Sequence, residues 1–209
     1  MKIISGEKKG HTLKTPDGDK TRPTLSRIRE SLFSIIAGDI PGSVFCELFG
    51  GCGSIALEAL SRGAERAVIV EMARAPLQCI RDNIRKLQYQ DRVQVVATDA
   101  FRWKIPGGGD SPDIIFADPP YDEELINRLL RHLESSRISP DALIIVQAPS
   151  QMQIMTSMQH LRTATYGATS LHFMLSATPL EKLESDTGSS VQATGAPASP
   201  ADQLARGSR

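Results

Sequence analysis

The sequence lacks the features that mark membrane, secreted and disulfide-rich proteins. Its 209 residues contain no run of eighteen apolar residues, so we expect no membrane-spanning segment. The first residues carry no apolar stretch of the kind found in secretory signal peptides. There are only three cysteines, and none of them lies in a Cys-x-x-Cys pair. This scarcity is typical of reduced thiols in a cytoplasmic protein and argues against a disulfide framework.

Patterns that bind metals are also missing. None of the four histidines stands at metal-ligand spacing from a cysteine or an acidic residue; they are His11, His132, His160 and His172. We therefore expect no bound metal and interpret these histidines as surface or core residues.

The formal net charge is zero, but the charges are distributed unevenly. Residues 1–37 carry eight Lys or Arg and only four Asp or Glu, so the rest of the chain has an equal acidic excess. A basic N-terminal segment is typical of proteins that bind a polyanionic partner such as a nucleic acid. A solvated charged face gives the same pattern, and charge alone leaves both interpretations open.

From Val44 onward, short apolar runs alternate with amphipathic segments. We predict five buried strands, at residues 44–49, 67–70, 93–97, 114–117 and 143–146. Apolar residues at helical spacing lie between several of these runs. The alternation predicts a parallel sheet with helices on both faces. Residues 161–166 and 170–176 are too close in sequence for a crossover helix, so they should pair antiparallel at the edge of the sheet.

The segments on either side of this sheet differ in character. Residues 1–15 alternate in a strand-like way and predict a short β-hairpin. Residues 24–37 place apolar residues at helical spacing, and we expect this helix to turn Arg27 and Arg29 away from its apolar stripe. We therefore divide the chain into a basic hairpin and helix at 1–40, an α/β domain at 41–180 and a disordered tail at 181–209.

A glycine-rich turn follows the first predicted strand. Gly51 and Gly53 would let a ligand approach the backbone without a Cβ in the way. The next two strands end in acidic residues. Glu71 is placed to accept the hydroxyls of a ribose, and Asp99, with Ala100 beside it, lies where an adenine edge would be. The pattern predicts a site for an adenosine-containing cofactor.

These residues alone leave two cofactors open. The stretch from Gly51 to Ala56 also fits the dinucleotide pattern G-x-G-x-x-A, with Glu71 at about the distance of its ribose acid, so an NAD-dependent oxidoreductase fits nearly as well. Glu47 stands just before the loop that Phe49 begins. A carboxylate there favours S-adenosylmethionine (SAM), because it suits a zwitterionic ligand that carries a sulfonium.

The motif Asp118-Pro-Pro-Tyr121, directly after the fourth predicted strand, indicates the chemistry. Its prolines fix the backbone and leave carbonyl oxygens that only accept hydrogen bonds. The Asp118 carboxylate and the Pro119 carbonyl could hold the two N–H groups of an exocyclic amine and aim its lone pair at a methyl donor. Tyr121 offers a flat face for a base taken out of its stack. A dehydrogenase has no use for such a turn, so we predict a SAM-dependent amine methyltransferase.

Four stretches together resemble the RsmD family of 16S ribosomal RNA guanine-N2 methyltransferases, over residues 1–175. They are Ile3-Ile-Ser-Gly6, Thr21-Arg-Pro-Thr24 with Arg27-Ile-Arg-Glu30, Leu48-Phe-Gly-Gly-Cys-Gly53, and Asp118-Pro-Pro-Tyr121. The resemblance implies a class I SAM-dependent methyltransferase: an α/β, Rossmann-like, seven-stranded sheet whose last strand is antiparallel. It also implies that the substrate is one guanine of 16S ribosomal RNA, presented in a small-subunit ribonucleoprotein particle.

By position, the resemblance implies that Arg22, Arg27 and Arg29 contact RNA. Their physical role would be to bind backbone phosphates, although pairing with acidic residues of the domain is an alternative. We expect a monomer with no membrane contact. Other amine methyltransferases, acting on adenine N6 of nucleic acid or on protein glutamine, remain alternatives.

The chain departs from the family's pattern near the expected site. Glu47 stands where the family usually has Asp, and Gln147 stands where it commonly has Glu. The second departure replaces an ionisable side chain with a neutral amide. Residues 103–112 are also predicted to form an irregular loop, in place of the family's usual helix.

Overall fold

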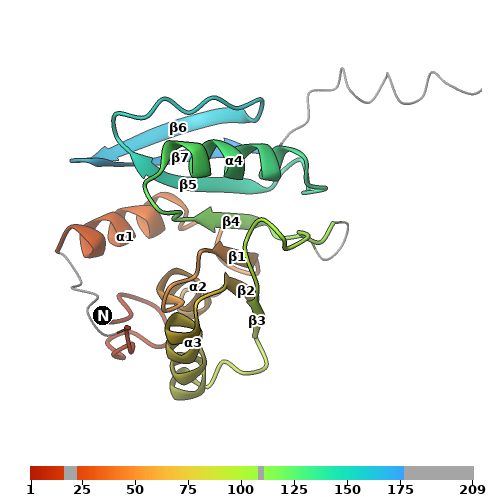
Figure 1. The fold of residues 1–209 in the computed structure, drawn as a ribbon. Helices are drawn as coiled ribbons and strands as arrows, with labels where there is room; N and C mark the ends of the chain where they lie inside the picture. Colours follow the sequence, from red (N-terminus) through yellow and green to blue (C-terminus); the bar gives the residue numbers. More distant parts are fainter. Residues whose placement is uncertain (17–22, 108–110, 177–209) are drawn as a thin grey trace, which may run out of the picture. The chain divides into compact units, whose positions relative to one another are not determined.

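A seven-stranded mixed sheet organises the computed structural model, which describes residues 1–16, 23–107 and 111–176. Its strands are β1 (Val44–Leu48), β2 (Arg66–Glu71), β3 (Val93–Ala97), β4 (Ile114–Ala117), β5 (Leu143–Pro149), β6 (Gln159–Tyr166) and β7 (Thr169–Leu175). Their spatial order is β3-β2-β1-β4-β5-β7-β6 (Figure 1). Strands β1 to β5 are parallel, and β7 runs antiparallel between β5 and β6. The predicted α/β class with a reversed last strand is therefore confirmed.

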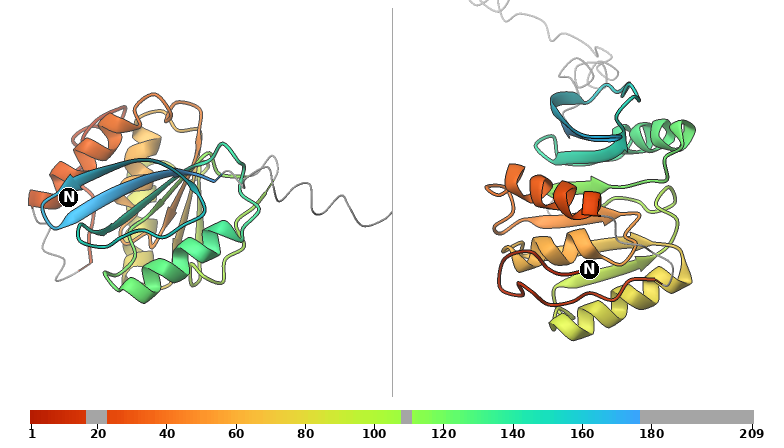
Figure 2. Two further views of the ribbon diagram at one scale, coloured as in Figure 1. Left: turned by 90° about the horizontal axis from the view of Figure 1, so that it is seen from above. Right: turned by 90° about the vertical axis from the view of Figure 1, so that its left-hand side faces the viewer.

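Helices cover both faces of the sheet, as the alternating pattern predicts (Figure 2). They are α1 (Pro23–Ile35), α2 (Ser54–Ser61), α3 (Arg74–Leu87) and α4 (Glu123–Glu134). Neighbouring residues of a strand point to opposite faces. Phe45 therefore packs in the core under α1, α2 and α3, while Cys46 packs in the core under α4. Helix α4 begins where the Asp122 carboxylate accepts a hydrogen bond from Leu125 N at 2.9 Å.

The prediction of a buried strand at residues 93–97 has the right bounds but the wrong burial. Strand β3 lies at the edge of the sheet and pairs only with β2, and none of its five residues is fully buried. Val93, Val95 and Val96 are partly exposed. An apolar run predicts a strand, but its place in the sheet depends on pairing that the run does not encode.

The first sixteen residues form a short antiparallel hairpin, as predicted, with one bridge between Lys2 and Thr12. Its two arms are joined by backbone hydrogen bonds from Ile3 N to His11 O, from Gly10 N to Ile3 O and from Leu13 N to Met1 O, each of 2.9 Å. The Glu58 carboxylate of α2 also accepts hydrogen bonds from the backbone N–H groups of Ile4 (2.7 Å) and Ser5 (3.0 Å). The hairpin is thus held both by its own backbone pairing and by contacts to the main domain.

Helix α1 and the first residues belong to the same compact unit as the sheet, Met1–Thr178. Ile28, Leu32 and Phe33 of α1 join the core that contains Phe45. The predicted irregular loop has no helix in its described residues, 103–107 and 111–112. The tail predicted at 181–209 lies outside the described residues. None of the helices in the described ranges has the length and apolar content that a bilayer crossing requires.

Candidate active site

The loop between β1 and α2 brings the backbone to the carboxyl edge of the sheet. Phe49, Gly51 and Gly53 all have positive φ angles, of 58°, 54° and 77°, a conformation that favours glycine. A Cβ at Gly51 would meet no described atom within 4 Å, so this position faces open space. A Cβ at Gly50 would lie 2.4 Å from Ile69 Cγ2. Gly50 is therefore required for packing, while Gly51 leaves room for a ligand.

Glu47 lies at the end of β1 and its carboxylate faces the start of α2. It is buried, and it accepts hydrogen bonds from Ala56 N at 2.9 Å and Ile55 N at 3.4 Å. These bonds satisfy amide groups at a helix start that has no side-chain cap from Gly53. Burial raises the pKa of Glu47 to about 8, the helix amides lower it, and the nearby Asp118 raises it further.

Glu71 ties the glycine loop to the end of β2. One of its carboxylate oxygens accepts a hydrogen bond from Gly51 N at 2.9 Å. The other accepts from Met72 N and Ala73 N, both at 2.8 Å. The carboxylate thus holds the loop while remaining partly exposed at the sheet edge.

Asp99 and Ala100 follow the end of β3. The Asp99 carboxylate accepts a hydrogen bond from Phe101 N at 2.9 Å, and Ala100 is buried. The sequence placed Asp99 at the close of the third strand, and the structure places it two residues beyond Ala97. Ala100 packs in the core under α4, so it supports the surface next to Asp99.

Asp118 begins the turn that follows β4, and a neighbouring glutamine holds its carboxylate. Gln147 Nε2 on β5 donates hydrogen bonds to Asp118 Oδ1 at 2.9 Å and to the Tyr121 hydroxyl at 3.1 Å. The Tyr121 hydroxyl also lies 2.8 Å from Thr169 Oγ1. Tyr121 as a whole is 50% exposed, so it remains accessible although its hydroxyl is anchored. Burial raises the pKa of Asp118 to about 7.

The contacts of Gln147 explain the physical role of this residue, which in the sequence is notable only because the family commonly has Glu there. An amide nitrogen donates hydrogen bonds, whereas an ionised carboxylate at the same position could only accept them. Gln147 therefore favours the ionised form of Asp118 and adds no second negative charge beside it.

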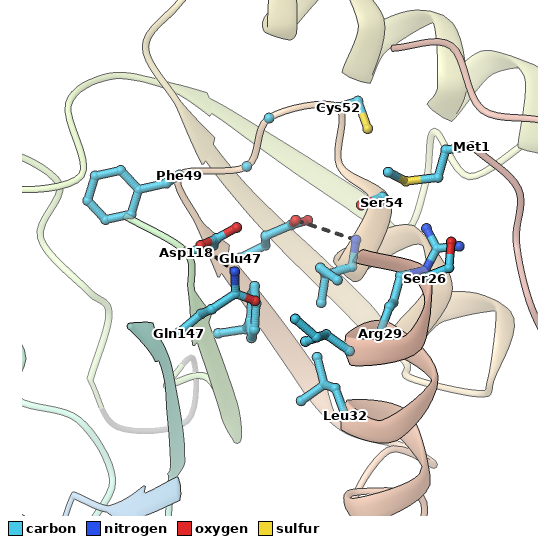
Figure 3. A pocket seen from close by; sticks show the side chains of 15 residues that line it. Met1, Ser26, Arg29, Leu32, Glu47, Phe49, Cys52, Ser54, Asp118 and Gln147 are labelled. Atoms are coloured by element: carbon cyan, nitrogen blue, oxygen red, sulfur yellow. Dashed lines mark hydrogen bonds between the residues drawn. The ribbon is translucent and has the colours of Figure 1, made fainter. Parts of the chain in front are cut away.

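One cavity of about 210 Å³ joins the end of β1 to the end of β4 (Figure 3). Four of the residues predicted for cofactor or substrate line it, together with Arg29 and Gln147; these four are Glu47, Phe49, Gly51 and Asp118. The cavity does not reach the described residues Glu71, Asp99 and Tyr121. The structure thus brings the motifs that follow β1 and β4 together. Glu71 and Asp99, which we expect to contact the ribose and the adenine, lie at the ends of β2 and β3.

The prediction that Arg29 faces away from the apolar stripe of its helix is wrong. Arg29 is only 5% exposed and lines the cavity, whereas Arg27 is exposed. Residues two apart on an α-helix lie about 200° apart around its axis, so both arginines cannot face the same partner. Arg29 therefore does not have the exposure that a phosphate contact requires. Arg22 lies outside the described residues.

The described ranges contain no group of three or more His, Cys, Asp or Glu residues placed to hold a metal ion. His132 and His172 each have a buried Nε2 without a hydrogen-bond partner among the described residues. Neither residue lines the cavity.

Fold and site together define a class I SAM-dependent methyltransferase. Solved methyltransferases that hold SAM or its product S-adenosylhomocysteine share this fold. Residues 1–175 match the family model described as Conserved hypothetical protein 95. The chain belongs to this family, the RsmD family, as the sequence motifs indicate.

Individual relatives support this assignment. YlbH of Bacillus subtilis (strain 168) is 33% identical over 175 residues, covering 81% of this chain and 95% of the relative. The Ribosomal RNA small subunit methyltransferase D of Escherichia coli (strain K12) is 34% identical over 149 residues, covering 71% of this chain and 74% of the relative. The solved structure of yhhF from Escherichia coli is 28% identical, covers 85% of this chain and 99% of its own, and has a TM-score of 0.74.

Proposed function

We propose that this protein transfers a methyl group from SAM to the exocyclic N2 amine of a guanine in 16S ribosomal RNA. One observation carries the proposal: Asp118 of the Asp-Pro-Pro-Tyr motif lines the same cavity as the glycine loop. Strands β1 and β4 are neighbours, with Leu48 paired to Ala117, so their motifs meet at one edge of the sheet. The printed name of the Escherichia coli relative, a small-subunit ribosomal RNA methyltransferase, supports the choice of RNA.

The residues at this edge fit SAM. The open side of Gly51 gives room for close approach of a ligand to the loop. In this proposal Glu71 accepts the ribose hydroxyls, and Asp99 lies against the adenine. Glu47 and Phe49 line the cavity on the side of the amino-acid end. When bound, SAM supplies a methyl group that its positively charged sulfur activates.

The chain's own residues would bind the target base and orient its amine. The Asp118 carboxylate and the Pro119 carbonyl accept hydrogen bonds from the two amine N–H groups, which aims the lone pair into the cavity. The exposed face of Tyr121 stacks on the base while its hydroxyl stays fixed by Gln147 and Thr169. With a pKa of about 7, Asp118 can accept the proton that the amine loses at neutral pH.

The basic segment 1–40 supplies the RNA-facing surface in this proposal. Arg27 is exposed on α1 and is free to contact a backbone phosphate. Because relatives are named for the small subunit, we propose a ribonucleoprotein particle as the substrate and a monomer as the acting form.

The decisive test is transfer of labelled methyl from SAM to small-subunit particles that lack the modification, followed by digestion to nucleosides. We expect label in N2-methylguanosine, and more of it with particles than with naked ribosomal RNA. Label in N6-methyladenosine would mean that the protein methylates an exocyclic amine, as proposed, but on adenine instead of guanine. If particles, RNA and DNA all stayed unlabelled while SAM still bound, the proposed function would be wrong.

SAM affinity is expected to rise with pH, by about tenfold between about pH 6 and pH 8. Below its pKa of about 8, Glu47 is largely protonated and neutral. A cationic ligand binds the ionised form more tightly, so affinity increases as pH approaches that pKa and levels off above it. Titration calorimetry across this range measures the effect.

The variant Glu47→Gln is the matched control for this pH dependence. Its side-chain oxygen can still accept a hydrogen bond from Ala56 N, but it does not titrate. We expect it to abolish the rise between about pH 6 and pH 8, because the group that titrates there is removed. A wild-type affinity that stays constant over the whole range would contradict the prediction.

A further inference from the structure

Arg29 is a buried cation on the wall of the cavity. Its side chain reaches from α1 toward the start of α2, where Ser54 lies (Figure 3). The apolar residues Leu32 and Phe33, one helical turn further along α1, are completely buried. Arg29 thus shares the inward face of its helix. Burying a guanidinium is unfavourable unless its charge and donors find partners.

Only part of the guanidinium has such a partner. Arg29 Nη2 donates a hydrogen bond to the backbone oxygen of Lys2 at 2.5 Å. Nε and Nη1 are both buried and have no hydrogen-bond partner among the described residues. A buried donor without an acceptor costs free energy, and the few found in native proteins call for an explanation such as a ligand.

Acidic side chains near Arg29 do not supply the missing acceptors. The Glu58 carboxylate exerts the strongest attraction on Arg29, but it bonds to the backbone of Ile4 and Ser5 and to Arg62. Burial lowers the pKa of Arg29, and Glu58 opposes that shift. Glu47 and Asp118 line the same cavity, yet neither forms an ion pair with Arg29 within the described ranges.

The charges around the cavity match those of the amino-acid end of SAM. That end carries one carboxylate, one ammonium and one sulfonium. The cavity wall offers one cation, Arg29, and the carboxylate of Glu47, while Asp118 lines the same cavity where the target amine is proposed to bind. A guanidinium can bind both oxygens of a carboxylate in a bidentate pair, through Nη1 and Nη2 or through Nε and Nη2. Nη2 of Arg29 has a second N–H besides the one that it donates to Lys2 O.

We infer that Arg29 binds the carboxylate of the methionine part of SAM through Nη1 and the second N–H of Nη2. The inference rests on the proposed function, since it takes SAM as the ligand of this cavity. It assigns to α1 a role in holding the methyl donor, in addition to any contact that the exposed Arg27 makes with RNA. The hydrogen bond from Nη2 to Lys2 O fixes the guanidinium, so the N-terminal loop orients it toward the cavity.

The test compares SAM with decarboxylated SAM, two ligands that differ only in the carboxylate. We expect wild-type protein to bind SAM about 30-fold more tightly than the decarboxylated form, measured by titration calorimetry. In Arg29→Met, SAM affinity should fall by about the same factor, and affinity for the decarboxylated form should stay within about twofold. The preference for the carboxylate would then disappear.

Two further variants make this comparison robust. Arg29→Lys keeps the positive charge but lacks the planar guanidinium, so it should bind SAM about fivefold more tightly than decarboxylated SAM. If circular dichroism shows that Arg29→Met is unfolded, Arg29→Lys serves as the test variant in its place. Arg81→Met is the matched control, because it removes an exposed arginine of α3 outside the cavity. It should leave the 30-fold preference for SAM over decarboxylated SAM unchanged; this preference corresponds to about 2 kcal/mol.

The possible results separate this inference from the function that it rests on. If Arg29→Met keeps the preference for SAM, or loses affinity for both ligands equally, Arg29 does not bind the carboxylate. If the wild-type protein shows no preference between the ligands, the inference is also wrong. If the wild-type protein binds neither ligand, the proposed function itself is overturned.

Discussion

Asp118→Ala is expected to lower the rate of methyl transfer by about 1,000-fold or more, with little change in SAM affinity. The Asp118 carboxylate is the hydrogen-bond acceptor that orients the target amine in the proposed mechanism, and it lies at the wall of the cavity. An exocyclic amine is a poor nucleophile because its lone pair is delocalised into the ring. Without the carboxylate, the lone pair is no longer aligned, and the proposed acceptor of the amine proton is lost. The adenosine contacts that we propose along β2 and β3 are untouched.

Single-turnover transfer to small-subunit particles measures this effect, and calorimetry with SAM measures binding in the same preparation. Asp118→Asn keeps an acceptor oxygen for the amine but has no charge, so we expect a smaller loss, of about 100-fold. Asp122→Ala is the matched control. It removes the cap of α4 four residues away, at a cost of about 1 kcal/mol in stability, and should leave the rate within about twofold.

Transfer by Asp118→Ala that stayed within tenfold of wild type would contradict this mechanism, because the amine would then be oriented by another group. A parallel loss of SAM binding would instead mean that Asp118 holds the ligand, so the two measurements distinguish a catalytic residue from a binding residue.

Much of the fold could be predicted because its signals are local. Continuous apolar runs located the parallel strands, and the short separation of the last two segments required an antiparallel pair. The same logic placed the glycine loop and Asp118 at one edge of the sheet, since parallel strands end on the same side. Burial at the edge strand β3 and the anchoring of the first residues on Glu58 depend on contacts between distant segments, which a single sequence does not reveal.

Arg29 and Gln147 show where reasoning from the sequence stops. The position of Arg29 could have been read more closely, because Leu32 and Phe33 lie three and four residues further along the same helix face. The role of Gln147 was not readable, since it requires β5 to lie beside β4 and the turn after β4 to bring Tyr121 within 3.1 Å.

Glu58→Ala is expected to lower the free energy of unfolding by about 3 kcal/mol. The Glu58 side chain is completely buried in α2. Its carboxylate accepts hydrogen bonds from Ile4 N, Ser5 N and Arg62 Nε, at 2.7, 3.0 and 2.7 Å. Alanine would leave all three donors without this acceptor and would create a cavity beneath the N-terminal loop.

Urea unfolding of the wild-type protein and the variant measures this change, and hydrogen exchange at the Ile4 and Ser5 amides shows whether the loop is released. Glu65→Ala, which removes an exposed carboxylate 4.0 Å from Arg66, should change stability by less than about 0.5 kcal/mol. A loss below about 1 kcal/mol in Glu58→Ala, with both amides still protected, would show that the loop is held without Glu58. If the loop is released, SAM affinity should also fall, because Lys2 O would no longer orient Arg29.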